Sequence, residues 1–208
     1  MSERAALAAT DPVMASLIER IGEIDLATRL ARRSEERPED PYGALLRAIV
    51  GQQLSTKAAR TIYLRVVELF DGATPSPEQL LEASEEDLRA CGLSGRKTEY
   101  IRDLARHVLS GELELDRLDQ LSDEDVIEEI VAVRGLGQWT AEMFLLFHLE
   151  RPDVLSGGDL GIRKAIQVEY GLGEMPSAAR VIEIGEPWRP HRSLASLYLW
   201  ESLAAVPG

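Results

Sequence analysis

The segment VRGLGQWTAEMF, residues 133–144, places Gly135 and Gly137 on either side of Leu136, with a helical pattern directly after them. Gly135 can take the left-handed conformation that ends a helix, and Gly137 lets the chain turn again before a second helix begins by Thr140. The N–H groups at the start of that helix point outward, and such groups bind phosphate. The spacing therefore predicts a tight hairpin, anchored by Leu136, that binds a sugar–phosphate backbone without reading bases. A plain turn between two helices is the alternative.

Helical periodicity extends over nearly the whole sequence and predicts the elements that position this hairpin. Asp40, followed by a proline, and Ser55 read as helix N-caps, and Ser122 with Asp125 is close to a capping box. Residues 139–149 are apolar nearly all round, which predicts a central, buried helix. Helices are predicted over 41–53, 56–70, 78–83, 85–91, 95–109, 122–133, 139–149, 159–170, 177–185 and 191–204, with a loop at 71–77. Since no segment shows the alternation of a strand, the predicted fold class is all-α.

The composition is that of a globular protein that does not enter membranes. The chain has 208 residues, 45% hydrophobic and 28% charged, which is enough for one core or for two lobes that share a cleft. No apolar run approaches the roughly 20 residues that a membrane span requires, and the N-terminus is too polar for a secretory signal. The single Cys91 excludes an intramolecular disulfide and any four-cysteine metal or iron–sulfur site. We therefore expect a cytoplasmic protein with no membrane partner, and a monomer is the default expectation.

The formal net charge of −13 is opposite in sign to that of most nucleic-acid-binding proteins, but the charge is unevenly distributed. Residues 112–130 hold nine carboxylates and one basic residue, Arg117. Basic residues cluster elsewhere, at Arg96, Lys97, Arg102 and Arg106, at Lys57 and Arg60, and at Arg163 and Lys164. A locally basic face can bind DNA in spite of the net charge, with an affinity that falls steeply with salt. The alternative is that these clusters are solvated helix faces.

Three segments, in the same order, resemble the helix-hairpin-helix DNA glycosylase superfamily and, within it, the bacterial 3-methyladenine DNA glycosylase II branch. The hairpin, a buried helix, a glycine-rich loop and Asp159 follow one another in VRGLGQWTAEMFLLFHLERPDVLSGGDLGIRKA, residues 133–165. The segment AIVGQQLSTKAA, residues 48–59, is similar to the one that carries the DNA wedge in that branch. The segment WRPHRSLASLYLW, residues 188–200, is similar to its C-terminal helix. Together the matches span about residues 40 to 202.

The resemblance implies two helical lobes with a cleft between them: residues 38–149, and residues 1–37 with 150–208, without a separate N-terminal β domain. It implies a nucleoid-associated, monofunctional DNA glycosylase of base excision repair that flips a base out of double-stranded DNA. The enzyme would hydrolyse the N-glycosidic bond of alkylated purines such as 3-methyladenine and 7-methylguanine. Two alternatives stay open: a non-catalytic DNA-binding module, and a glycosylase for another lesion such as hypoxanthine, uracil or mispaired adenine.

The resemblance also assigns roles to individual residues. Asp159 would stabilise an oxocarbenium-like sugar and activate water, whereas the alternative makes it only the N-cap of its helix. Trp139 stands where lyase-active relatives carry a lysine, so no β-lyase activity is expected, and it would stack on a cationic base. Met143 replaces a tyrosine of better-known members. The full assignment places Trp139, Met143, Trp200 and Tyr42 in the base pocket, Gln53 or Leu54 at the wedge, and Gly135, Gly137, Thr140, Arg96 and Lys97 at phosphates.

No cofactor is expected for catalysis, and no iron–sulfur cluster. In the family the hairpin often binds a monovalent cation, Na⁺ or K⁺, through backbone carbonyls. These carbonyls correspond to Val131, Val133 and Leu136. Such an ion is structural and bridges carbonyl and phosphate oxygens.

Overall fold

The computed structural model describes residues 2–24 and 40–204 and divides them into two compact units. The Asp159 unit consists of the described parts of Met1–Arg33 and Leu145–Gly208, and the hairpin unit consists of the described part of Ser34–Phe144. No strand occurs among these residues, so the predicted all-α class is confirmed. The boundary predicted between residues 37 and 38 lies outside the described residues. In this part of the chain no helix combines the length and hydrophobicity of a membrane span.

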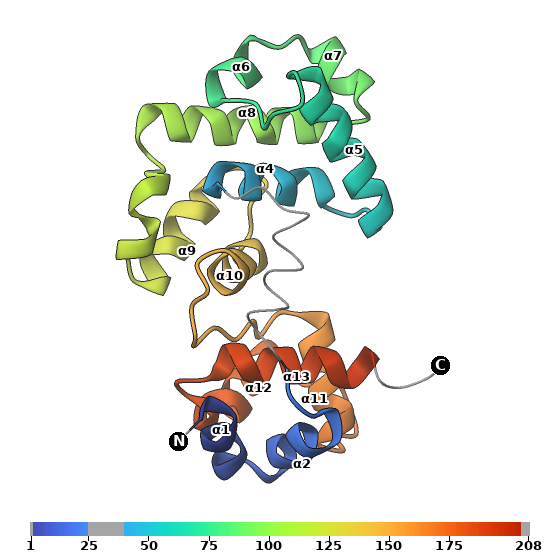
Figure 1. Cartoon of the computed structure of the whole chain (residues 1–208), viewed down its shortest axis with the longest axis vertical. Helices are drawn as coiled ribbons and strands as arrows, with labels where there is room; N and C mark the ends of the chain where they lie inside the picture. The colour runs from blue at the N-terminus through green and yellow to red at the C-terminus, as the bar shows by residue number, and fades with distance from the viewer. Residues whose placement is uncertain (1, 25–39, 205–208) are drawn as a thin grey trace. The chain divides into compact units, whose positions relative to one another are not determined.

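The hairpin unit is built around α8, which packs against α4, α6 and α7 (Figure 1). Its helices are α4 (Pro41–Gly51), α5 (Thr56–Leu69), α6 (Pro77–Glu82), α7 (Glu85–Ala90), α8 (Gly95–Ser110), the 3-10 helix η1 (Leu115–Gln120), α9 (Asp123–Ala132) and the first part of α10 (Gln138–Phe147). Asp40, Ser55 and Ser122 cap their helices as predicted. A full capping box forms instead at Ser76 and Gln79, where the sequence predicted a loop up to residue 77.

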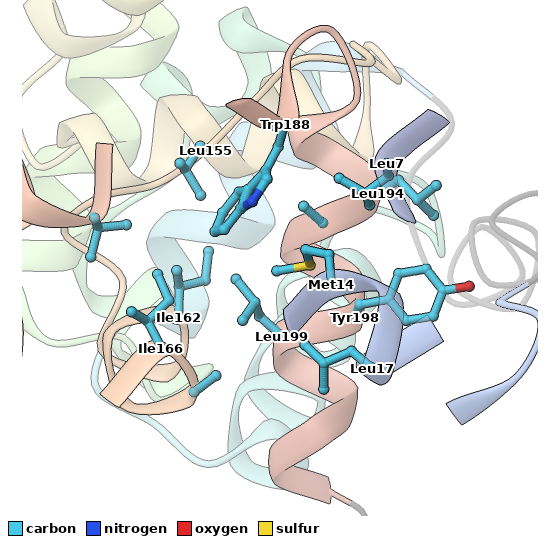
Figure 2. Packing of buried hydrophobic residues seen from close by; sticks show 13 residues of the cluster. Leu7, Met14, Leu17, Leu155, Ile162, Ile166, Trp188, Leu194, Tyr198 and Leu199 are labelled. Atoms are coloured by element: carbon cyan, nitrogen blue, oxygen red, sulfur yellow. The ribbon is translucent and has the colours of Figure 1, made fainter. Parts of the chain in front are cut away.

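The Asp159 unit buries apolar side chains that come from helices at both ends of the sequence. Its helices are α1 (Glu3–Thr10), α2 (Pro12–Ile21), the last part of α10, α11 (Leu160–Glu169), α12 (Ala178–Gly185), the 3-10 helix η2 (Glu186–Trp188) and α13 (Arg192–Ala204). Both α1 and α2 contact α13, and so does α11. Figure 2 shows the resulting cluster, in which Met14 and Leu17 of α2 meet Tyr198 and Leu199 of α13.

A buried carboxylate, Asp11, connects three distant parts of this unit. Its Oδ1 caps α2 by accepting from the N–H groups of Val13 at 2.8 Å and Met14 at 3.3 Å. Its Oδ2 accepts from the Tyr170 hydroxyl and from Trp188 Nε1 at 2.9 Å. Burial by itself would raise the pKa of Asp11, but these four hydrogen bonds outweigh it and hold the pKa below its ordinary value.

Replacing Asp11 with alanine should lower the free energy of unfolding by about 3–5 kcal/mol, because the helix cap is lost and two buried donors are left unpaired. Because the folded-state pKa of Asp11 is depressed, its contribution is present above about pH 4 and is lost as the pH falls through the folded pKa. The stability difference between wild type and Asp11→Asn should therefore shrink below about pH 4. Urea unfolding at pH 7 and at pH 3 measures both effects. An equal difference at the two pH values would contradict the charged role of Asp11.

Candidate active site

The predicted hairpin forms between α9 and α10, but its first turn differs from expectation. Helix α9 ends at Ala132, and Val133 leaves it in an extended conformation with φ −74° and ψ 126°. The expectation that Gly135 ends the helix is therefore wrong, since the helix stops before it. Gly135 has φ +89° and serves the turn that follows, while Leu136 is buried as predicted.

Two contacts from other segments hold Gly135 in place. A Cβ on this residue would overlap the ring of Tyr100, which belongs to α8. The Gly135 carbonyl accepts a hydrogen bond of 2.6 Å from Nε2 of Gln52, the residue that follows α4. The link between Gln52 and the hairpin was not predicted from the sequence, because Gln52 and Gly135 lie far apart in the chain.

The open N-terminus of α10 supplies the candidate phosphate donors. The N–H groups of Thr140 and Ala141 both donate to the Gly137 carbonyl, at 2.9 and 3.1 Å. By contrast, the N–H groups of Gly137 and Gln138 have no acceptor among the described residues. Nothing lies within 4 Å of a Cβ built on Gly137, so this end of the helix is accessible. The backbone donors without an acceptor at this end of α10 are thus those of Gly137 and Gln138, of which only Gly137 was predicted from the sequence. The assignment of Thr140 to a phosphate stays a prediction.

The two predicted side-chain phosphate contacts differ in their surroundings. Arg96 is exposed in the first turn of α8. Lys97 is half-buried, and its Nζ donates to the Val50 carbonyl of α4 at 2.7 Å. Burial lowers the pKa of Lys97. The hydrogen bond to Val50 therefore gives Lys97 a structural role within the hairpin unit. The assignment of Lys97 to a phosphate stays a prediction.

The predicted wedge lies in the turn between α4 and α5. Gln53 has φ +57°, a conformation that residues other than glycine rarely adopt. Leu54 is 38% exposed, and its N–H donates to the Gly51 carbonyl at 3.2 Å. Both side chains are exposed, so exposure alone does not choose between them as the wedge.

The predicted base-pocket residues of the hairpin unit fall into two environments. Trp139 is 53% exposed and Met143 is half-buried, four residues further along α10 on the same helix face. The expectation that residues 139–149 form a helix buried all round is therefore wrong at Trp139. Tyr42 is buried, and its hydroxyl has no hydrogen-bond partner among the described residues. Burial, followed by the charges of Glu78 and Asp40, raises its pKa. The assignment of these three residues to a base pocket stays a prediction.

Asp159 is the N-cap of α11, and it is also bonded to a tryptophan. Its Oδ1 accepts from the Ile162 N–H at 2.8 Å and from Trp200 Nε1 at 2.9 Å. Trp200 is half-buried and stacks on Phe147 with ring centroids 5.8 Å apart. Trp200 was predicted to lie in the base pocket as an aromatic ring, and that assignment stays a prediction. The structure gives its indole N–H a second task, which is to hold the Asp159 carboxylate in one orientation.

Gly161 allows this hydrogen bond to form. A Cβ on Gly161 would lie 3.0 Å from Asp159 Oδ1, 3.0 Å from Trp200 Cδ1 and 3.1 Å from Trp200 Nε1. A side chain there would push the indole and the carboxylate apart. Gly161 was not predicted to be functional, although a glycine in the first turn of a helix, two residues after a candidate carboxylate, is a signal that the sequence contains.

A family model described as the HhH-GPD superfamily base excision DNA repair protein matches residues 46–190, which include both the hairpin and Asp159. The chain belongs to this superfamily. It is 37% identical to DNA-3-methyladenine glycosylase 1 of Schizosaccharomyces pombe over 172 residues, which cover 82% of this chain and 75% of that protein.

Two solved structures of the superfamily resemble the whole chain. A DNA-3-methyladenine glycosidase from Bacillus halodurans has a TM-score of 0.85 and 40% identity, and the match covers 99% of this chain and 90% of the other. A 3-methyladenine DNA glycosylase of S. pombe, in complex with abasic DNA, has a TM-score of 0.82 and 30% identity over 99% of this chain and 98% of that one. The family assignment made from the sequence is confirmed.

Gly161→Ala should disturb the Asp159–Trp200 hydrogen bond, whereas Gly158→Ala should not, because nothing lies within 4 Å of a Cβ built on Gly158. We expect Gly161→Ala to shift the indole N–H resonance of Trp200 and to lower the rate of base excision at least about tenfold, since small displacements of a reacting group are costly. The Gly158→Ala variant is the matched control and should match the wild type. Two variants with equal rates and equal indole spectra would show that the close approach at Gly161 is unimportant.

Proposed function

We propose that the chain is a monofunctional DNA glycosylase that hydrolyses the N-glycosidic bond of alkylated purines, such as 3-methyladenine and 7-methylguanine, in double-stranded DNA. The observation that carries this proposal is the Asp159 carboxylate, held by Ile162 N–H and Trp200 Nε1 in a chain of a base excision repair family. The names of the relatives, which are 3-methyladenine glycosylases in both S. pombe and B. halodurans, support the substrate class.

The chemistry required of Asp159 follows from the bond that is broken. As the bond between C1′ and the base nitrogen breaks, its electron pair leaves with the base and the sugar gains oxocarbenium character. A fixed carboxylate beside C1′ stabilises that positive charge, and it can accept a proton from the water that attacks C1′. Alkylation at N3 or N7 makes the purine cationic, so the departing base becomes neutral. The Trp200 and Ile162 donors fix the direction of the carboxylate before the substrate arrives.

The enzyme is monofunctional in this proposal because the position of the lyase lysine is occupied by Trp139. A lysine there would attack C1′ and form a Schiff base, whereas an indole cannot. Water is then the nucleophile, and the product is an abasic site with an intact backbone. We further propose that Trp139, which is exposed on α10, stacks on the extruded base.

The hairpin is proposed to bind the DNA backbone through the N–H groups of Gly137 and Gln138. A Na⁺ or K⁺ ion held by the carbonyls of Val131, Val133 and Leu136 would reinforce this contact. The Val133 carbonyl already accepts the Leu136 N–H at 3.1 Å and keeps one lone pair for a cation. These oxygen ligands suit a hard cation, and such an ion has a structural role only.

Asp159→Asn tests the reaction, because asparagine also caps helices and so the fold should survive while the negative charge is lost. We expect release of methylated purines from dimethyl-sulfate-treated duplex DNA to fall by about 10²–10³-fold or more. Asp40→Asn, which changes another N-cap aspartate, is the matched control and should retain activity. Circular dichroism verifies the fold of both variants.

Each outcome of this experiment has a clear meaning. Full activity of Asp159→Asn would reduce Asp159 to a helix cap and refute the mechanism. A wild-type chain that binds duplex DNA but releases no methylated purine would be a binding module or a glycosylase for another lesion.

Leu54→Ala should slow excision from duplex DNA more than Gln53→Ala. An exposed leucine gains about 25 cal/mol per Å² on entering the base stack, whereas a glutamine amide must give up its hydration. We expect about a tenfold loss for Leu54→Ala on duplex DNA and a much smaller loss on single-stranded DNA, where no gap needs filling. Single-turnover rates on the two substrates measure the difference. A larger loss for Gln53→Ala would identify Gln53 as the wedge.

A further inference from the structure

A polar cavity of about 270 Å³ opens beside the start of α8 in the hairpin unit. Its lining comes from α8, from Glu85 at the beginning of α7 and from Arg134 of the hairpin. None of its residues takes part in the chemistry proposed for Asp159. The charged and hydroxyl side chains that line it are those of Glu85, Thr98, Glu99, Arg102, Arg106 and Arg134.

Two residues that line this cavity each hold a buried polar atom that has no partner among the described residues. Thr98 is only 2% exposed, and its Oγ1 makes no hydrogen bond within the described residues. Nε of Arg102 is also buried without a partner, although another nitrogen of the same guanidinium, Nη2, donates to the Ala83 carbonyl at 2.7 Å. Leaving a buried donor unpaired costs about 1–3 kcal/mol, and the large majority of buried polar atoms in native proteins have a protein, water or ion partner.

The charges around the cavity favour an anion. Thr98, Arg102 and Arg106 follow one another at four-residue intervals, so they share one face of α8. The two carboxylates already face arginines, because Glu99 lies 3.8 Å from Arg134 and Glu85 lies 3.7 Å from Arg89. Within the described residues Arg102 and Arg106 make no ion pair. Helix α8 is sixteen residues long, and the partial positive charge at its N-terminus adds to the positive potential at the cavity.

We propose that this cavity binds one phosphate group through Thr98 Oγ1 and the guanidinium groups of Arg102 and Arg106. Guanidinium N–H groups match phosphate oxygens in geometry and charge, and a hydroxyl completes the set of donors. The site adjoins the hairpin, because the Arg134 N–H donates to Oδ2 of Asp103 on α8 at 2.8 Å and Gly135 follows directly. When DNA is bound, the phosphate in this cavity belongs to the DNA backbone and is additional to the phosphates that the hairpin binds. This part of the proposal rests on the proposed function.

Titration of the full-length chain with inorganic phosphate tests the site without DNA. At constant ionic strength, phosphate but not chloride should produce saturable shifts in the NMR signals of Arg102 Nε–H and of the Thr98 amide. Arg106→Gln and Thr98→Val should weaken this binding at least about fivefold, because each removes one donor. Thr98→Val should not destabilise the protein, since the lost hydroxyl has no partner. Arg65→Gln removes the same charge from an exposed arginine of α5 and should bind phosphate like the wild type.

The salt dependence of duplex binding identifies the source of the phosphate. If the group belongs to DNA, the slope of log K against log[salt] should fall by about one for Arg106→Gln relative to Arg65→Gln. Single-turnover excision at saturating enzyme should be unchanged for the control variant Arg65→Gln, which lies outside the proposed site. Phosphate binding with an unaltered DNA slope would mean a free anion and would overturn the DNA half of the proposal. Absence of saturable shifts in the wild type would overturn the site itself, whatever the glycosylase activity proves to be.

Discussion

Oδ1 of Asp159 accepts two hydrogen bonds, one from the first turn of its own helix and one from the Trp200 indole, and the architecture of the Asp159 unit serves this arrangement. The cap fixes the carboxylate relative to α11, and the indole fixes it relative to α13. The two helices must therefore approach closely, which Gly161 permits at the point of contact. Below that point Ile162 and Ile166 of α11 belong to the same buried cluster as Leu199 of α13 (Figure 2). Apolar packing thus sets the position of a polar group.

The hairpin unit solves a different problem, because its candidate DNA contacts are largely backbone groups. Backbone N–H groups can bind an anion only if they have no acceptor within the protein. A turn with such free N–H groups needs contacts from other segments to hold its conformation. Tyr100 packs on Gly135 from one side, and Gln52 bonds its carbonyl from another segment. Such local donors matter more than usual in a chain of net charge −13. Because the first turn of α9 is acidic, it does not attract DNA electrostatically. DNA binding by this unit therefore depends on individual donor groups.

The sequence was sufficient for features that depend on neighbouring residues. The caps at Asp40, Ser55, Ser122 and Asp159 mark real helix starts, because a cap is decided within four residues. The Ser76 capping box was missed because Pro77 was taken for a loop residue, although proline is also favoured at the first position of a helix.

Contacts between distant residues were not readable in the same way. Nothing in the local pattern connects Trp200 with Asp159, or Gln52 with Gly135, across the many residues that separate them. The exposure of Trp139 was not predicted for the same reason. Hydrophobic periodicity states which residues share a helix face, but it does not state which face another element covers.

The two units also differ in how they treat buried polar groups, and this difference bears on function. In the Asp159 unit the buried Asp11 is satisfied by four donors, and Ser193 and Ser196 are bonded to backbone groups. Among the described residues, five buried side-chain atoms have no partner, and all but the one on His191 belong to the hairpin unit. Unpaired polar atoms oppose folding, so a unit that keeps several of them is less stable than its apolar packing alone would allow. A phosphate at the proposed site would supply partners for Thr98 and Arg102 only, and its binding would then raise the stability of the hairpin unit.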